Sequence, residues 1–356
     1  SEMCIRDRFC ILALALWGPA MAGAQAQTQS LDVANISDKL TLTYKPKANS
    51  STDYAWFYKV GTNGTDTEFS GTLTGTEEKT DCPVITIKSE KEATSPNYDD
   101  CAKLILNGVK LTAVADSGLF VIGEKTKPLC IQATGESTLK CKATGKSQFY
   151  VIKNYDGGIL LLDGGDAGLN IVGDGGGIYL DQASIYIKEG GINDNQATKG
   201  GAIYTEGTKA GSCLLNIEGG TISGNCANES GAGIFAICSK GTRDDMKVEI
   251  FGGTIAHNYS GTGENLEENA IVLMGEDPNL TEDTGFADLY LSGSPVITGS
   301  VTLADDYCAA DSKNYSPLIH VDDSFNVNKP ILVSPIYGDD PDTVSYTHLR
   351  AHETRR

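Results

Sequence analysis

Hydrophobic and polar positions alternate in short stretches along the middle of the chain, and the pattern recurs roughly every 30 residues. Segments 187–195, 217–225 and 250–258 align without gaps. In each segment the alternation leads to a glycine, then to an isoleucine two positions later and to an asparagine three positions after that. Alternation with period two predicts β-strands with one buried face. The shared positions are Gly190, Gly220 and Gly253; Ile192, Ile222 and Ile255; and Asn195, Asn225 and Asn258.

A second block follows each asparagine and combines glycines with apolar residues. It spans 200–204 and 231–235, with a weaker copy at 269–272 and an earlier relative at 175–179. Differences in length between the repeats fall in the loops between these blocks. Variation confined to one place indicates that each repeat is one structural turn around a fixed core.

The length of the repeat narrows the choice of architecture. A unit with about three short strands is too short for a four-stranded propeller blade, and it has no helical periodicity. It fits one coil of a right-handed parallel β-helix, in which each strand pairs with its counterpart in the next coil at about 4.8 Å. We therefore predict an all-β solenoid with an internal ladder of isoleucines, asparagines that bond neighbouring coils, and glycines where the chain turns. A flexible glycine-rich linker does not explain isoleucines at such regular positions.

The rest of the chain divides into segments with weaker signals. Residues 82–170 carry fainter strand patterns, so the β-helix is predicted over 82–300. Residues 27–81 are rich in Thr and Asn and contain an alternating aromatic stretch, which predicts a small N-terminal β cap over the open end of the solenoid. Within it, Trp56 is favoured as a cap-core residue over a sugar-stacking one. Residues 301–343 are predicted to supply closing strands.

The two ends of the chain carry different kinds of sequence. Residues 9–26 combine an apolar run too short to span a bilayer with small residues typical of a cleavage site, which predicts a secretory signal peptide. The expected location is therefore secreted or at the cell surface, with no membrane span in the visible chain. Residues 1–8 and 344–356 resemble translated sequencing-adapter read-through, and the alternative is an ordinary basic tail.

Charge limits the range of partners. The chain has 47 acidic and 28 basic residues and a formal net charge of −19, and five of its six arginines lie in the terminal segments. Such an acidic body repels phosphate backbones, so no nucleic-acid partner is predicted. Exposed aspartates are compatible with Ca²⁺ binding, although acidic surfaces more often serve solubility alone. No other cofactor is expected.

Cysteines add a second constraint. Eight of the ten lie between residues 27 and 343, and an even number in an exported protein predicts disulfides. Two pairs are close enough in sequence to close small loops in the N-terminal coils. These candidates are Cys82 with Cys101 and Cys130 with Cys141. The alternative is that some cysteines, such as Cys213, are buried thiols. No C-x-x-C spacing is present, so no zinc site is predicted.

One motif connects the repeats to a known class of proteins. Ile-x-x-Asn followed by Gly-Gly-Ala-Ile, as at 192–195 and 200–203, resembles the polymorphic outer-membrane protein repeat of chlamydiae and related bacterial surface proteins. The resemblance covers about residues 170–300, although that family usually has Phe in place of the isoleucine. It implies a β-helical surface protein, in several cases an adhesin. In residues 82–170, apolar strands separated by Asn-Gly or Asp-Gly weakly resemble carbohydrate-binding β-helix domains.

Residues suited to catalysis are sparse on the predicted coils. Acidic pairs fall in loops or at the fringe, and Arg243 lies in a loop between repeats. Two histidines, His257 and His320, do not complete a triad with a serine and an acid. The outward positions of the repeat strands form a mixed row without paired acids. These positions are Tyr186, Asn216 and Glu249, with Lys188, Glu218 and Phe251 next along. Catalysis is therefore not predicted.

The predicted function is adhesin-like binding or display by an exported surface protein, with an extended glycan or a host or matrix surface as partner. The alternative is a polysaccharide-binding module, and a polysaccharide lyase or hydrolase is the third candidate. Candidate glycan contacts are the aromatic residues of the glycine-rich blocks, namely Tyr179, Tyr204 and Phe235. The alternative is that these rings form a stack on one face of the β-helix.

Overall fold

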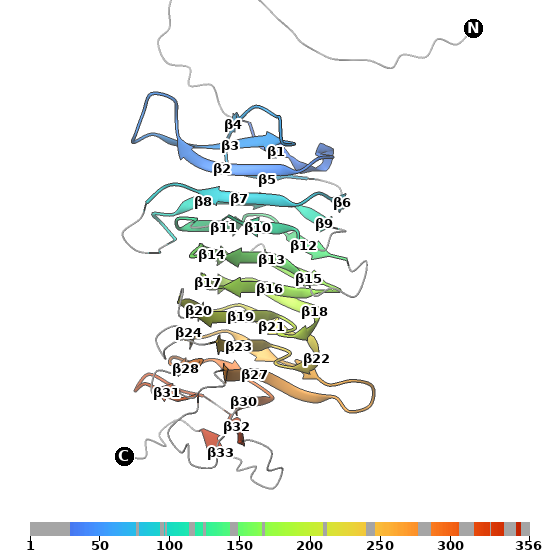
Figure 1. Ribbon diagram of the computed structural model, residues 1–356, viewed down its shortest axis with the longest axis vertical. Coiled ribbons are helices and arrows are strands. Elements are labelled where there is room, and N and C mark those ends of the chain that lie inside the picture. Colours follow the sequence, from blue (N-terminus) through green and yellow to red (C-terminus); the bar gives the residue numbers. More distant parts are fainter. Residues whose placement is uncertain are drawn as a thin grey trace, which may run out of the picture.

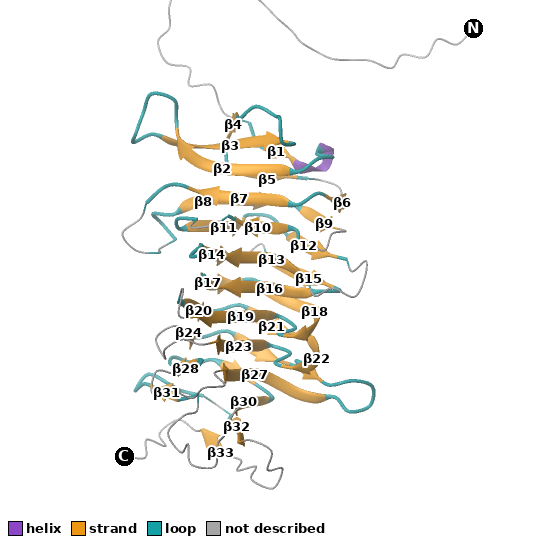
Figure 2. Ribbon diagram, viewed as in Figure 1, coloured by secondary structure: helices purple, strands orange, loops and turns teal. Residues whose placement is uncertain are grey.

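Strands recur down the long axis of the molecule in columns, as the computed structural model shows (Figure 1). The structure describes residues 29–75, 78–92, 96, 98–113, 118–123, 126–142, 149–165, 168–208, 212–239, 246–276, 286–305, 317–327, 329–337 and 347–349. Strands dominate these residues, and loops lie at the corners between them (Figure 2). The fold is therefore all-β, with a short 3₁₀ turn, η1 (Val33–Asn35), near the N-terminus.

One column is a ten-stranded sheet, which we call sheet A. Each of its strands pairs in parallel with the strands of the adjoining coils. In order along the molecule these are β1 (Leu31–Asp32), β5 (Thr72–Thr74), β8 (Ala102–Asn107), β11 (Leu129–Ala133), β14 (Ile159–Asp163), β17 (Ser184–Glu189), β20 (Cys213–Ile217), β24 (Met246–Ile250), β28 (Asp288–Leu291) and β31 (Ile319–Val321).

Two further parallel columns complete the coils. Sheet B contains β7 (Ile85–Ser89), β10 (Phe120–Ile122), β13 (Tyr150–Tyr155), β16 (Gly176–Asp181), β19 (Ile203–Thr208), β23 (Ile234–Ser239), β27 (Glu267–Glu276), β30 (Ser300–Asp305) and β32 (Ile331–Tyr337). Sheet C contains β6 (Lys79–Cys82), β9 (Lys110–Ala113), β12 (Ser137–Cys141), β15 (Leu169–Gly173), β18 (Gly191–Lys199), β21 (Thr221–Ser223), β25 (Thr254–Ala256) and β29 (Val296–Ile297). The chain passes from sheet A to C to B and returns to A one coil further on. This connectivity confirms the predicted parallel β-helix.

Columns of aliphatic side chains fill the interior. On sheet C, Ile192 pairs in register with Ile222, and Ile222 pairs with Ile255. Their exposed fractions are 3%, 3% and 1%, and the column continues to Ile171 at one end and Ile297 at the other. Neighbouring strands stack about 4.8 Å apart, so each side chain packs on its counterparts in the coils before and after it. The three repeat isoleucines thus form part of a continuous internal ladder.

Glycines turn the chain between sheets A and C. Gly190, Gly220 and Gly253 have positive φ angles of 123°, 83° and 82°. A Cβ at Gly220 would lie 2.6 Å from the carbonyl oxygen of Gly190 in the preceding coil. The coils therefore approach too closely at this corner for a side chain, and the left-handed backbone also favours glycine.

Replacement of Gly220 by alanine is expected to destabilise the protein by more than the about 1–2 kcal/mol that a left-handed backbone alone costs. The excess arises because the backbone of the neighbouring coil must move. Gly157 supplies a matched control, since its φ is 77° and a Cβ there meets no described atom within 4 Å. Urea unfolding of G220A and G157A measures the difference. Equal losses of stability would show that close approach of the coils does not constrain Gly220.

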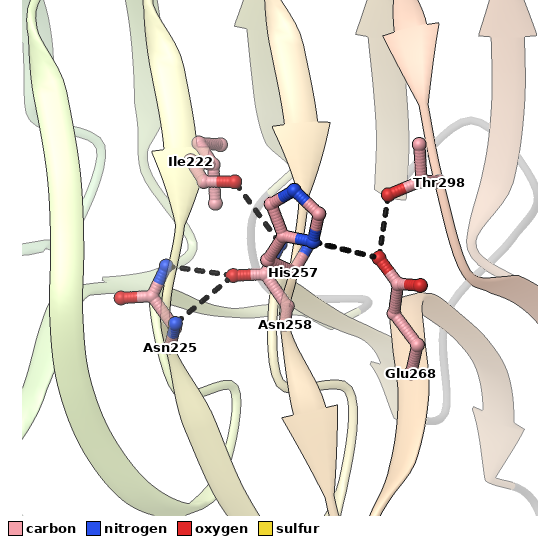
Figure 3. A network of polar contacts seen from close by, with 6 residues as sticks. All are labelled: Ile222, Asn225, His257, Asn258, Glu268 and Thr298. Atoms are coloured by element: carbon pink, nitrogen blue, oxygen red, sulfur yellow. Dashed lines mark hydrogen bonds and ion pairs between the residues drawn. The ribbon is translucent and has the colours of Figure 1, made fainter.

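Asparagines hold a second corner, where sheet C continues into the short strands β22 (Cys226–Ser230) and β26 (Tyr259–Ser260). The Oδ1 of Asn225 accepts hydrogen bonds from the backbone N–H and the Nδ2 of Asn195, at 3.0 and 2.9 Å. Asn258 accepts the same two bonds from Asn225, at 3.2 and 2.8 Å (Figure 3). All three residues are at most 1% exposed. The side-chain amides thus satisfy buried polar groups of two coils at once.

The residue before each of these asparagines has a left-handed backbone. The φ angle is 54° at Asp194, 69° at Gly224 and 56° at His257. At the last of these corners, Glu268 Oε1 accepts a 2.8 Å hydrogen bond from the backbone N–H of His257 and a 2.5 Å bond from the hydroxyl of Thr298 (Figure 3). Because Asp, Gly and His occupy these three equivalent positions, the sequence repeat does not reveal that all three share a left-handed backbone.

Antiparallel strands cover the N-terminal end of sheet B. β2 (Leu40–Pro46) pairs in parallel with β7 and antiparallel with β3 (Tyr54–Val60), which pairs with β4 (Thr67–Phe69) (blue in Figure 1). This is the predicted β cap. Trp56 is 4% exposed and donates from Nε1 to the Lys103 carbonyl oxygen at 2.7 Å, so it belongs to the cap core. The parallel ladder nevertheless begins before residue 82, because β1, β5 and β6 already belong to sheets A and C.

The C-terminal strands continue the same columns. β31 pairs in parallel with β28, and β32 pairs in parallel with β30, so residues expected to close the solenoid extend sheets A and B. β33 (Thr347–Leu349) then pairs antiparallel with β32. In the described part of the chain, no helix has the length and apolar character needed to cross a membrane.

Candidate binding surface

Side chains that point outward from sheet A stand in register along the molecule. The pairing places Tyr186 beside Asn216, and Asn216 beside Glu249. The same column continues through Tyr290 to His320. A second row lies two residues further on, near the end of β17 and directly after β20 and β24. We call the two rows together the outer strip, which comprises Tyr186, Asn216, Glu249, Tyr290 and His320 with Lys188, Glu218 and Phe251.

Hydrogen bonding is incomplete in the middle of the outer strip. Asn216 donates from Nδ2 to Glu249 Oε2 at 2.9 Å. Its Oδ1 is buried and has no hydrogen-bond partner among the residues that the structure describes. Burial and the nearby Glu249 carboxylate raise the pKa of Tyr186, so its hydroxyl stays protonated and remains a donor. Because this oxygen is buried, a ligand hydroxyl reaches it only after the Asn216 side chain moves.

A histidine and a carboxylate lie at the C-terminal end of the outer strip. The His320 ring stacks on Tyr290 with centroids 4.3 Å apart and planes inclined by 9°. Its Nε2 is 3.4 Å from Oδ2 of Asp288, which is 2% exposed. The other carboxylate oxygen accepts from the backbone N–H of Leu318 at 2.8 Å. This group was not predicted from the sequence, because β28 and β31 lie outside the three regular repeats. The alternation of Leu289 and Leu291 nevertheless indicated that Tyr290 points outward.

The N-terminal end of the outer strip meets a covered region of sheet A. Lys188 Nζ is 3.4 Å from Oδ2 of Asp163 and 5.3 Å from the ring centroid of Tyr98. Tyr98 packs over a small buried cluster on the outer side of the sheet. The cluster consists of Cys101, Cys130 and Leu161. The accessible part of the sheet face therefore begins near Tyr186.

The aromatic residues proposed as glycan contacts lie on sheet B and stack on one another. The ring centroids of Tyr179 and Tyr204 are 5.5 Å apart, and those of Tyr204 and Phe235 are 5.4 Å apart, with interplanar angles of 21° and 14°. Lys199 Nζ lies 5.2 Å from the ring centroid of Phe235, which is 2% exposed. Burial raises the pKa of Tyr179 to about 12. Because the stack occupies ring faces, sugar stacking on these faces is disfavoured, and the role of these residues in glycan binding stays a prediction.

A cavity of about 530 Å³ lies beside the cap. Its aromatic lining is Tyr44, Tyr54, Trp56 and Phe69. The Tyr44 ring lies 5.6 Å from that of Tyr54 and 5.3 Å from that of Trp56. Charged side chains are also part of the lining, and two of them, Lys47 and Glu68, form an ion pair at 2.8 Å. This volume lies within the range of small-ligand sites. The combination of rings and charges suits a polar ligand with an apolar face.

Strand pairing shows where the four candidate cysteines lie. The two members of each predicted disulfide belong to different sheets. Cys82 and Cys141 each stand in register with Ala113 on sheet C. Cys101 and Cys130 lie together on the outer side of sheet A. Each pair predicted from the sequence thus joins different sheets, and the structure brings Cys101 beside Cys130 instead. Residues close in sequence diverge here because the chain passes from sheet C through sheet B to sheet A between Cys82 and Cys101, and from sheet A to sheet C between Cys130 and Cys141.

Cys213 fits the alternative interpretation as a buried thiol. It is 2% exposed, and its Sγ donates to the Ala183 carbonyl oxygen at 2.9 Å. Burial raises the pKa of this thiol to about 11, which keeps it protonated and unreactive near neutral pH. Cys308 lies outside the described residues.

Other residues considered for chemistry are dispersed. Arg243 lies outside the described residues, while the acidic pairs 99–100 and 322–323 are exposed in loops next to sheet A. Within the described ranges, no group of three or more His, Cys, Asp or Glu side chains is arranged to hold a metal ion. The outer strip and the cavity beside the cap are therefore the candidate sites.

Comparisons with protein-family models, with curated proteins and with solved structures give no match to this chain.

Proposed function

We propose that the protein is a non-catalytic, adhesin-like binding β-helix that holds an extended glycan or matrix partner along the outer strip. The observation that carries the proposal is the register of Tyr186, Asn216 and Glu249 with Tyr290 and His320. Successive positions lie about 4.8 Å apart, so a partner aligned with the axis meets one set of side chains on each coil. Export rests on the predicted signal peptide at residues 9–26, and the adhesin role rests also on the motif resemblance.

The chemistry of the outer strip favours an uncharged glycan. Phe251 is 44% exposed, so its ring offers apolar surface to the C–H face of a sugar. Tyr186 and Tyr290 are partly exposed and add apolar surface, although His320 covers one face of the Tyr290 ring. Glu218 and Glu249 accept hydrogen bonds from hydroxyl groups. The excess of acid in the chain repels sulfated or uronic-acid polymers.

A glycan array followed by calorimetry on the best ligand tests the proposal. Each of F251A and Y290A is expected to weaken binding about fivefold, since truncation of one contact in a distributed site costs about 1 kcal/mol. The triple variant Y186A/F251A/Y290A is expected to lose measurable binding. The control is L266A, because Leu266 is 51% exposed in the loop between β26 and β27 and lies outside the outer strip. Unchanged affinity in the triple variant would refute binding at this surface.

A polysaccharide-binding module that uses the cavity beside the cap is the second candidate. The observation that favours it is the aromatic and charged lining around Tyr44 and Tyr54. In the same calorimetric experiment, Y54A would then abolish binding while the triple variant of the outer strip would bind normally. A catalytic role would appear as steady release of unsaturated or reducing sugar ends by the purified protein, lost in R243A or H320A.

A further inference from the structure

Two cysteines from adjacent coils share one buried cluster on the outer side of sheet A. Cys101 immediately precedes β8, and Cys130 lies in β11, the next strand of that sheet. They are 7% and 1% exposed and pack with Leu161 beneath Tyr98. The two side chains also approach within hydrogen-bonding range of each other. Two thiols are thus held together by coil stacking, although 28 residues separate them in the chain.

Access to the two thiols differs. Cys101 lines the cavity of about 530 Å³ beside the cap, together with Lys103 and Asp99. Cys130 lies deeper and is not part of the cavity lining. A small molecule in the cavity therefore reaches Cys101 first, while Cys130 stays behind it.

We propose that Cys101 and Cys130 form a redox-active thiol pair that a low-molecular-weight disulfide converts into a disulfide between adjacent coils. The Cys101 thiolate attacks one sulfur of the small disulfide, forms a mixed disulfide and releases one small thiolate. The Cys130 thiolate then attacks the Cys101 sulfur, forms the protein disulfide and releases the second small thiolate. The small disulfide gains two electrons, the two cysteines lose them, and the two cysteine protons are transferred to the departing thiolates or the solvent.

The electrostatic environment assigns the order of these steps. A hydrogen bond from Cys130 stabilises the thiolate of Cys101 and, with nearby Lys103 and Lys91, lowers the pKa of Cys101 despite its burial. The interaction with Cys101 and burial raise the pKa of Cys130. Once Cys101 is in a mixed disulfide it carries no charge, so its effect on Cys130 is removed. Cys101 is therefore the attacking thiol, and Cys130 is the resolving thiol.

The thiol pair differs from both disulfides expected from the sequence. Those pairs would close loops of neighbouring residues, whereas a bond between Cys101 and Cys130 joins one coil to the next. It would also remove the 3.6 Å hydrogen bond that the Cys101 thiol donates to the Tyr98 carbonyl oxygen, because a disulfide sulfur carries no hydrogen. Oxidation thus acts at the boundary between the cap cavity and the covered end of sheet A.

Peptide mapping of the full chain tests the proposal. The protein is reduced, desalted, treated with glutathione disulfide, quenched with acid, alkylated under denaturing conditions and digested with trypsin without reduction. Lys91, Lys103 and Lys140 provide cleavage sites that separate the four candidate cysteines. The expected product is a cross-linked peptide pair containing Cys101 and Cys130, lighter by two hydrogens than the sum of the free peptides.

Serine variants test the order of attack. C130S is expected to accumulate glutathione on Cys101, and C101S is expected to leave Cys130 unmodified until the protein is denatured. C213S is the control and should give the same cross-link as the unaltered protein. Alkylation of both thiols after oxidation, or links from Cys101 to Cys82 and from Cys130 to Cys141, would refute the proposal. Because the mapping uses the unaltered chain, it remains decisive even if a serine variant fails to fold.

Discussion

Ile222→Asp is expected to prevent folding of the β-helix or to lower its free energy of unfolding by several kcal/mol. Ile222 is 3% exposed and stands between Ile192 and Ile255 in the internal ladder. A carboxylate at this position would be enclosed by the aliphatic side chains of the neighbouring coils, so either its charge or the packing of the coils must be lost. The effect spreads along the solenoid because each coil is stable only when packed on its neighbours.

Thr221→Asp is the matched control for this substitution. Thr221 precedes Ile222 in β21 and is exposed, so a carboxylate there remains in water and should change stability by less than about 0.5 kcal/mol. Circular dichroism and resistance to proteolysis measure both variants. Similar losses of structure in the two proteins would show that the inward and outward positions of this strand were assigned wrongly.

The core of the β-helix could be predicted from the sequence because the signals are local. Period-two alternation identifies the buried face of a strand, and the recurrence of Gly220, Ile222 and Asn225 in the neighbouring repeats identifies equivalent positions on successive coils. The structure places each of these residues at the corresponding corner or inside the core. The same alternation predicted that Tyr186, Asn216 and Glu249 form one outward row. The strand pairing of sheet A places the three residues in register.

Features that depend on contacts between coils could not be predicted from local sequence patterns. In a solenoid, residues about one repeat apart are neighbours, whereas residues about ten apart lie on different sheets. Cys130 and Cys141 illustrate the difference, because they are close in the chain but belong to sheets A and C. Loop length decides which residues meet, as it does for Cys101 and Cys130, and no local pattern encodes it. The start of the parallel ladder was missed for a related reason, since β1 and β5 are too short to show alternation.

The asparagine corner accounts for the second large effect expected from a single substitution. Asn225→Ala should lower the free energy of unfolding by about 2–4 kcal/mol, because loss of a buried hydrogen-bond partner costs about 1–3 kcal/mol for each group left unpaired. The amide of Asn225 donates to the carbonyl oxygens of Ile192 and Ser223 at 2.9 and 3.1 Å. Its Oδ1 accepts from Asn195 of the preceding coil. The substitution therefore removes bonds on both coils and leaves a cavity between them.

Asn195→Ala is the comparison variant, because Asn195 is the first of the three hydrogen-bonded asparagines at this corner. Gly173 stands opposite Asn195 in the preceding coil, and Asn195 Oδ1 has no hydrogen-bond partner among the residues that the structure describes. Alanine at position 195 keeps the backbone N–H that donates to Asn225, so fewer buried groups lose a partner and the loss of stability should be smaller. Urea unfolding of the two variants measures the order. A cost at position 195 equal to or above that at position 225 would contradict the view that these amides stabilise the solenoid by joining consecutive coils.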